Sequence, residues 1–308
     1  MRKFLIICVV SLSLILFGCK KEEAPVGEPV SVESGLRKTV LYFQDENSML
    51  VPVMKRIPWE SGIGKAALSY LVNTPENEQS AQSLGLKNVL PAETEISLRI
   101  EDGLANVNLV NVDKFENQQQ EQNAISAIVN TLTEFPAVER VKIKINGKDG
   151  QKLEHGTDLA TVFSSQDINI EASANTTQLL DNKVILYFAS ANSELNVPIT
   201  RYLFDVPTLE STILELIKGP NDLKSLKNCF PEGTEILDVQ IKDDIATINL
   251  SKEFERLREH PELEQRAIET LNLTCRNFGI NTVNIKVEGK EYKTDANTMA
   301  PAFANEFN

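Results

Sequence analysis

Histidine is scarce in this chain of 308 residues, which has only His155 and His260. Neither histidine has a histidine partner four residues on or a cysteine cluster beside it, so the pattern argues against a zinc site. We therefore expect no metal and no cofactor. His260 opens the stretch "HPELE", which is typical of a helix start, with a proline in the first turn and early glutamates that favour the helix dipole.

Cysteine is also scarce, and two of the four cysteines, Cys8 and Cys19, fall within the first nineteen residues. The remaining two, Cys229 and Cys275, could form a disulfide in an exported protein. Aligning the internal repeat described below places apolar residues of the first copy at both positions. The alignment favours two small buried thiols over a bridge.

Positive charge is in short supply, because 31 lysines and arginines face 44 aspartates and glutamates, giving a formal net charge of −13. Loss of residues 1–18 would remove Arg2 and Lys3 and no acidic residue, which moves the charge to −15. Such a surface repels nucleic acid, anionic lipid and anionic wall polymer. We expect no nucleic-acid partner; a basic protein surface or divalent cations would suit it better.

The apolar run Phe4–Phe17 is shorter than the ~20 residues of a membrane-spanning helix. It follows two basic residues, which is the layout of an export signal. The stretch Leu16–Cys19 resembles the lipobox of bacterial lipoproteins. The resemblance implies a signal peptide over 1–18 and a lipidated Cys19, carrying acyl chains such as palmitate, on the extracytoplasmic face of the cell membrane. An uncleaved anchor and plain secretion are the alternatives.

Most of the remaining chain is a tandem repeat. "LPAETEISLRIEDGLANVNL" at 90–109 returns as "FPEGTEILDVQIKDDIATINL" at 230–250. We divide the chain into a polar tether at 19–37, a first module at 38–150, a linker at 151–182, a second module at 183–290 and a tail at 291–308. The linker either carries a strand that packs on a module or only joins the two. The tail shows no clear period.

Each module has the same predicted order, β-β-α-β-β-α-β. The expected elements are a hairpin around an Asn-Ser turn (38–53; 183–199), an amphipathic helix followed by a proline (63–71; 209–217), a second hairpin (96–109; 239–250), a second helix (124–132; 267–278) and a closing strand (141–145; 283–287). Asp102-Gly103 supplies the second turn, and in the other copy we expect Asp244 to take the left-handed position of the glycine. The pattern predicts an α+β fold, a two-layer module with helices on one face of a mostly antiparallel sheet.

A glycosidase would need two carboxylates across a cleft. The candidates are Glu93, Glu95, Glu101 and Asp102 in the first module and Glu232, Glu235, Asp243 and Asp244 in the second. Their places at strand entries and turns favour solvated charges and turn formers over catalytic residues.

Two other stretches are candidate sites. "GIGKAALS" at 62–69 lacks the spacing of a phosphate-binding loop, and its glycines are better placed to open a helix. Trp59, the only tryptophan, matches the region 203–208 of the second copy and is either a partner contact or a core residue.

The stretch "IVNTLTEFPAVERVKIKINGK" at 128–148, together with the repeated hairpin and "LIKGP" at 216–220, resembles the GerMN domain of bacterial sporulation and germination lipoproteins. The likeness covers 38–148 and 183–290, although the second copy lacks the Glu-Phe-Pro step. The resemblance implies an extracytoplasmic role in envelope assembly during sporulation, with protein partners in a complex that bridges the mother-cell and forespore membranes. It also implies similarity to the ring-building modules of secretion-like machines.

Our hypothesis is a non-catalytic, membrane-anchored assembly protein. One alternative is a lipoprotein that binds a wall fragment or small solute in an apolar cleft with converging polar groups. A second, less favoured alternative is a peptidoglycan hydrolase. The sequence identifies no binding residue, and it leaves open the partner and the oligomeric state.

Overall fold

The computed structural model describes residues 35–58, 62–112, 115–171, 182–222 and 224–307. Residues 36–308 form one compact unit. The signal peptide, Cys19, nearly all of the tether and Trp59 lie outside the described residues, so the predictions made for them stay predictions.

The first module opens with a hairpin and alternates strands with helices. Its elements are β1 (Leu36–Asp45), β2 (Leu50–Pro58), α1 (Ile63–Ser69), α2 (Pro75–Gln82), β3 (Leu86–Lys87), β4 (Glu95–Glu101), β5 (Leu104–Val110), α3 (Gln118–Thr133) and β6 (Arg140–Ile145), followed in the linker by β7 (Ile170–Glu171).

The second module repeats the main order, with no counterpart of α2 among its described residues and with an added 3-10 helix and the short strand β14. Its elements are β8 (Lys183–Ser190), β9 (Asn196–Tyr202), α4 (Leu209–Lys218), β10 (Leu226–Lys227), β11 (Ile236–Lys242), β12 (Ile245–Leu250), the 3-10 helix η1 (Lys252–Glu259), α5 (Pro261–Arg276), β13 (Thr282–Val287), β14 (Lys290–Glu291) and, in the tail, β15 (Glu306–Phe307).

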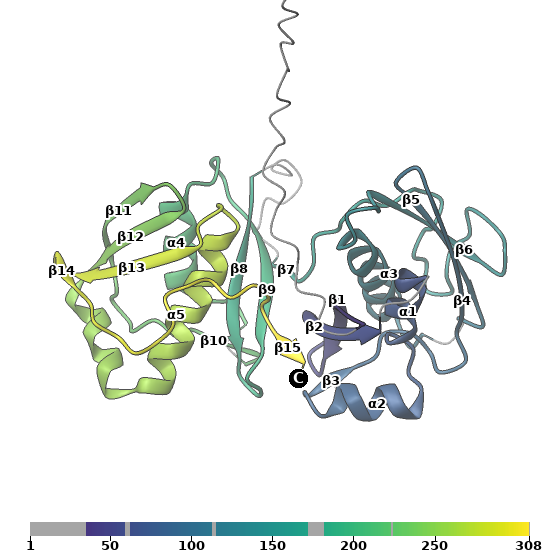
Figure 1. Ribbon diagram of the computed structural model, residues 1–308, viewed down its shortest axis with the longest axis horizontal. Coiled ribbons are helices and arrows are strands. Elements are labelled where there is room, and N and C mark those ends of the chain that lie inside the picture. The colour runs from purple at the N-terminus through teal and green to yellow at the C-terminus, as the bar shows by residue number, and fades with distance from the viewer. Residues whose placement is uncertain (1–34, 59–61, 113–114, 172–181, 223, 308) are drawn as a thin grey trace, which may run out of the picture. The chain divides into compact units, whose positions relative to one another are not determined.

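The strands of each module divide between two sheets. In the first module one sheet has the order β15-β2-β1-β3 and the other β4-β5-β6; in the second the orders are β10-β8-β9-β7 and β11-β12-β13-β14. The pairs β5–β6 and β12–β13 are parallel, because a helix connects them, whereas the hairpins are antiparallel. Figure 1 shows α1 and α3 lying between the β1–β2 hairpin and the β4-β5-β6 sheet.

The α+β class, the tandem duplication and the element order are confirmed. The pattern predicts one sheet per module, whereas the hairpin forms a sheet of its own on the far side of the helices. The helices contact both sheets: α3 packs on β1 and β6, and α5 packs on β8 and β13. The same hydrogen bond joins helix and hairpin in both modules. The backbone N–H of Tyr42 in β1 donates to Thr131 Oγ1 of α3 (3.2 Å), and that of Tyr187 in β8 donates to Thr274 Oγ1 of α5 (3.1 Å).

The structure differs from the sequence prediction at two places, after the first helix and in the second module's hairpin turn. Pro75 follows the first helix as predicted, but it is also the first residue of α2, which Thr74 caps by accepting a hydrogen bond from the N–H of Asn77. The left-handed residue of the second module's hairpin turn is Asp243 (φ 56°), so the prediction for Asp244 is wrong. Asp102 (φ 48°) occupies the same place in the first module, ahead of Gly103.

Cys229 and Cys275 are buried, free thiols, which confirms the interpretation against a bridge. Burial raises the pKa of Cys275 to about 12 and also raises that of Cys229. Both thiols therefore stay protonated at neutral pH and act as small apolar side chains.

Candidate functional site

The predicted carboxylates are dispersed. Glu95 and Glu101 begin and end β4, a strand of seven residues, so about 20 Å of extended chain separates them. Asp102 and Asp243 lie in hairpin turns, where their left-handed backbone explains their presence. A glycosidase pair lies about 5–9.5 Å apart, so Glu95 with Glu101 or Asp102 does not form one. Glu235 precedes β11 at the same place in the second module.

Both histidines have structural contacts. His155 Nε2 lies 2.7 Å from the carbonyl oxygen of Phe115, and its backbone N–H donates to Glu121 Oε1. His260 is the residue before Pro261, the first residue of α5, as the sequence predicts. Across the described part of the chain, no three histidine, cysteine, aspartate or glutamate side chains gather in a way that could hold a metal ion.

The most distinctive arrangement is the junction where strand β2 of one hairpin meets strand β9 of the other. Each strand contains a proline, Pro52 or Pro198, within its repeated "VP" step. Proline has no N–H to donate, which confines it to edge strands. The two edges therefore face each other with carbonyl groups that need donors from elsewhere.

Two asparagines, Asn169 of the linker and Asn305 of the tail, supply those donors. Asn169 Nδ2 donates to the carbonyl oxygens of Leu50 (2.7 Å) and Pro198 (2.8 Å), and its Oδ1 accepts from the N–H of Leu50 (2.8 Å). Asn305 Nδ2 donates to the carbonyl oxygens of Asn196 (2.9 Å) and Pro52 (2.8 Å), and its Oδ1 accepts from the N–H of Asn196 (2.8 Å).

The backbone continues the same pattern on both sides. The carbonyl oxygen of Asn169 accepts from Thr200 N–H, after which β7 pairs in parallel with β9 of the second module. The carbonyl oxygen of Asn305 accepts from Met54 N–H, after which β15 pairs in parallel with β2 of the first module. Figure 1 shows β15, in yellow, beside β2, in purple. We call these two crossing segments, 165–171 and 303–307, the linker arm and the tail arm.

A buried charge cluster fixes the linker arm to the second module. Arg201 Nη2 lies 2.5 Å from Glu171 Oε2, and Arg201 Nη1 lies 3.0 Å from Glu215 Oε2. The same guanidinium donates to the carbonyl oxygens of Glu215 (3.0 Å) and Gly219 (2.8 Å). Glu171 also accepts from the N–H of Asn221 (2.8 Å), so β7, β9 and the end of α4 share one network.

Gly219 completes this network in a backbone conformation that glycine alone adopts readily, φ 88° and ψ 179°. A Cβ there would lie 2.6 Å from Asn228 Nδ2 and 3.0 Å from Asn228 Cβ. Gly219→Ala should therefore lower the free energy of unfolding by about 2 kcal/mol. Urea denaturation measures the loss, and Gly147→Ala, at a positive-φ turn with open space around it, is the control without the clash. Equal losses would contradict the packing argument.

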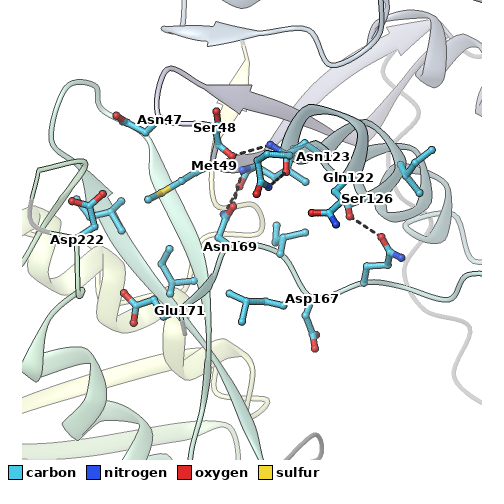
Figure 2. A pocket seen from close by; sticks show the side chains of 18 of the residues that line it. Asn47, Ser48, Met49, Gln122, Asn123, Ser126, Asp167, Asn169, Glu171 and Asp222 are labelled. Atoms are coloured by element: carbon cyan, nitrogen blue, oxygen red, sulfur yellow. Dashed lines mark hydrogen bonds between the residues drawn. The ribbon is translucent and has the colours of Figure 1, made fainter. Parts of the chain in front are cut away.

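An open hollow of about 970 Å³ lies beside the junction, between the first hairpin, α3, the linker arm and the second module. Its lining mixes amide side chains, such as Gln122 and Asn221, with apolar ones, such as Ile125 and Ile168. Figure 2 shows Asn169 in the middle of this wall, between Glu171 and Asp222 on one side and Gln122 and Ser126 on the other.

The acidic groups of the hollow are engaged by the protein itself. Asp167 accepts from Lys183 Nζ (2.5 Å) and from the hydroxyl of Tyr202 (2.8 Å), and Asp222 accepts from Ser225 Oγ (2.8 Å). Hydrogen bonds from Ser225 and Lys224 lower the pKa of Asp222. The hollow therefore presents amide groups beside carboxylates that are hydrogen-bonded within the protein.

A tyrosine pair lies close to the junction. The hydroxyl of Tyr42 donates to Glu134 Oε1 (2.9 Å). Burial, and then the charge of Glu134, raise the pKa of Tyr42 well above its usual value, and the same two causes raise that of Tyr187 in the other hairpin. Burial also raises the pKa of Glu134. Both tyrosines stay neutral at physiological pH.

The loop 203–208 presents two large apolar side chains to solvent. Phe204 is 80% exposed and Val206 is 77% exposed. The loop is tied at its base, because Asn182 Nδ2 donates to the carbonyl oxygen of Phe204 (3.0 Å) and Leu203 N–H donates to that of Asn182 (2.6 Å). It corresponds to the first-module loop that carries Trp59, which lies outside the described residues.

Sequence reasoning missed both bridging asparagines. The signal that could have found them is the proline in each repeated "VP" step, since a proline inside a strand marks an edge that needs another partner. The strands of the two arms show no hydrophobic alternation in the sequence, because β7 and β15 have two residues each.

The sequence of this chain is similar to those of sporulation and spore germination proteins. The Germane family model, described as sporulation and spore germination, matches residues 40–151 and 185–293. The spore germination protein GerM of Bacillus subtilis (strain 168) is 27% identical over 261 residues, which cover 81% of this chain and 71% of that protein.

A solved structure of tandem domains gives the same result. The tandem GerMN domains of the sporulation protein GerM from Bacillus subtilis match with a TM-score of 0.69 at 25% identity, over 89% of this chain and 100% of that one. The first GerMN domain of GerM matches 42% of this chain and 99% of its own length at 28% identity, with a TM-score of 0.39.

Proposed function

We propose a function from the premise that this chain belongs to the Germane family of sporulation and spore germination. It is a GerM-like protein with two GerMN domains in tandem. We infer that it is a non-catalytic lipoprotein, anchored through Cys19 on the extracytoplasmic face of the cell membrane. There it holds envelope proteins in a complex formed during sporulation or germination. None of the helices described is long and apolar enough to cross a membrane.

The observation that carries the assembly role is the exposed loop 203–208. Phe204 and Val206 are the two most exposed of the large apolar side chains described, and aromatic residues are the usual anchors of protein interfaces. Phe204 and Val206 are exposed on a loop whose base is hydrogen-bonded, so their exposure is a fixed feature of the fold. The acidic balance of the chain adds a preference for a basic partner surface.

Chemical cross-linking in membranes of the sporulating native host, followed by mass spectrometry of what is captured, tests this proposal. Envelope proteins should be recovered with the unaltered chain and depleted with Phe204→Ser. Leu203→Ser is not a suitable control, because Leu203 packs against the core. Glu210→Ser, on an exposed position of the neighbouring helix α4, is the matched control. Equal recovery from the Phe204 and Glu210 variants would exclude the loop as the contact.

Lipidation gives a separate prediction. The mature protein should begin at Cys19 and carry the mass of two or three acyl chains, which together hold it firmly on a membrane. Cys19→Ala should abolish the added mass and the cleavage before residue 19. Mass spectrometry of the purified amino-terminal peptide decides the matter. A mature chain that starts elsewhere without lipid would contradict the anchor.

The hollow favours one second candidate function, the binding of a neutral polar solute or wall fragment. Its amide and apolar lining suits hydroxyl and acetamide groups, and its carboxylates disfavour an anionic ligand. Calorimetry with N,N′-diacetylchitobiose, a neutral disaccharide with hydroxyl and acetamide groups, would test it, with Gln122→Ala as the variant expected to weaken binding. Heat of binding unchanged by that substitution, or absent at millimolar ligand, would sink this candidate.

A further inference from the structure

The junction is symmetric in detail, although it joins two parts of one chain. Asn169 bonds both backbone groups of Leu50, the carbonyl oxygen of Pro198 and the N–H of Thr200. Asn305 bonds both backbone groups of Asn196, the carbonyl oxygen of Pro52 and the N–H of Met54. Exchanging Leu50 with Asn196, Pro52 with Pro198 and Met54 with Thr200 turns one set of contacts into the other. This is the pattern of an isologous interface between two copies of one unit.

Each arm starts on the module that precedes it and ends on the other. Before the linker arm, Phe163 bridges Val141 of β6, and at the start of the arm Gln166 N–H donates to Asn130 Oδ1 of α3 (2.8 Å). Before the tail arm, Met299 bridges Thr282 of β13. Each module therefore gives a strand to its neighbour and receives one in return, which is how domain-swapped dimers are built.

We propose that two copies of this chain exchange tail arms, so that Asn305 and β15 of one copy dock on β2 of the other. The bonds that Asn305 and β15 make with β2 and with Asn196 can form in this way, because they depend on the arm and not on the chain that carries it. The exchange redirects the segment between Met299 and Asn305, and association costs entropy in addition. A short flexible connection gives an effective concentration in the millimolar range, which favours the closed monomer in dilute solution.

The tail arm is the arm suited to exchange. Its strand pairs two residues, Glu306 with Met54 and Phe307 with Lys55, and follows residues 292–305, which form no helix or strand. The linker arm is held more firmly, because the Arg201 cluster clamps Glu171 within it. Local opening at the tail should therefore precede opening at the linker. If the chain is lipid-anchored, crowding on a membrane would raise the local concentration toward the range where exchange competes.

Cysteine trapping tests the exchange with the mature chain, residues 19–308, carrying Cys19→Ser. Lys55 and Phe307 are directly paired in parallel register, which places their Cα atoms within the separation a disulfide spans. One chain carries Lys55→Cys, the other Phe307→Cys, and the two are refolded together over rising concentrations and oxidised. We expect a covalent heterodimer whose fraction rises with concentration and falls at least fivefold when Asn305→Ala is added to the Phe307→Cys chain.

Two controls make a negative result informative. A single chain with both Lys55→Cys and Phe307→Cys should close internally, which confirms that the pair can react. A partner chain with Glu262→Cys, at an exposed helix start, measures random collision. The proposal is overturned if the doubly substituted chain closes but the mixed chains give no heterodimer above the Glu262→Cys level. That outcome leaves the assembly role untouched, since the assembly role does not require a second copy.

Discussion

Arg201→Met is expected to lower the free energy of unfolding by about 3 kcal/mol. The substitution keeps most of the side-chain volume but leaves the carboxylates of Glu171 and Glu215 without the guanidinium that they both contact. Breaking a buried ion pair from one side costs about 3–5 kcal/mol, and the lower end applies because both carboxylates keep a second donor. Chemical denaturation followed by circular dichroism measures the change.

Arg99→Met is the matched control, since Arg99 pairs with Glu101 on the surface and its side chain is 75% exposed. A surface pair contributes about 0–1 kcal/mol, so this variant should stay within that range. Adding Glu171→Gln to Arg201→Met should recover part of the loss, because it removes a buried charge. A loss at Arg99 as large as the loss at Arg201 would contradict the burial argument.

The same cluster predicts the direction of an acid effect. Burial acts to raise the pKa of Glu215, but hydrogen bonds and charge from Lys218 and Arg201 outweigh it and hold the pKa below the usual value. A depressed folded-state pKa gives stability that is present above the unfolded-state pKa, about 4.3, and is lost as pH falls through the folded value. Arg201→Met should therefore lose less stability than the unaltered protein when the pH is lowered below about 4.

Asn305→Ala is expected to cost about 2–3 kcal/mol. It removes three side-chain hydrogen bonds and leaves the N–H of Asn196, a residue 1% exposed, without its acceptor. Asn169→Ala should cost a similar amount, because it breaks the same three kinds of contact and replaces an asparagine in the left-handed region (φ 50°). Asn47→Ala, at an exposed position, should stay within about 0.5 kcal/mol.

Hydrogen exchange distinguishes the two arms. Asn305→Ala should speed exchange at Met54, whose N–H donates to the carbonyl oxygen of residue 305, and leave Thr200 nearly unchanged. Asn169→Ala should do the reverse, because Thr200 N–H donates to the carbonyl oxygen of residue 169. Parallel changes at both amides in both variants would show a general loosening and contradict two separately seated arms.

Local chemistry made the main strands and helices of each module predictable, but not α2, η1 or the two-residue strands. The alternation of Ile96 and Leu98 against Ser97 and Arg99 fixes a half-buried strand, and the proline after His260 marks a helix start, as observed. The duplication was also predictable, because the two copies are similar in sequence.

What the sequence did not predict depends on contacts between distant residues. The division into two sheets follows from which strands pair across the helices, which alternation alone does not specify. Thr74-Pro75 reads as the end of one helix and the start of another, and only the structure shows that it is both. Asn305 meets Pro52 from 253 residues away, through a two-residue strand with no period.

Site-specific photo-cross-linking tests the assembly role most directly. A benzophenone amino acid is placed at Phe204 in one strain and at Gln122, inside the hollow, in another, and both chains are irradiated in sporulating cells of the native host. The account predicts a cross-link to an envelope protein from position 204, lost in the Cys19→Ala background, and no such cross-link from position 122. Cross-links to wall fragments from position 122, with none to protein from position 204, would contradict it.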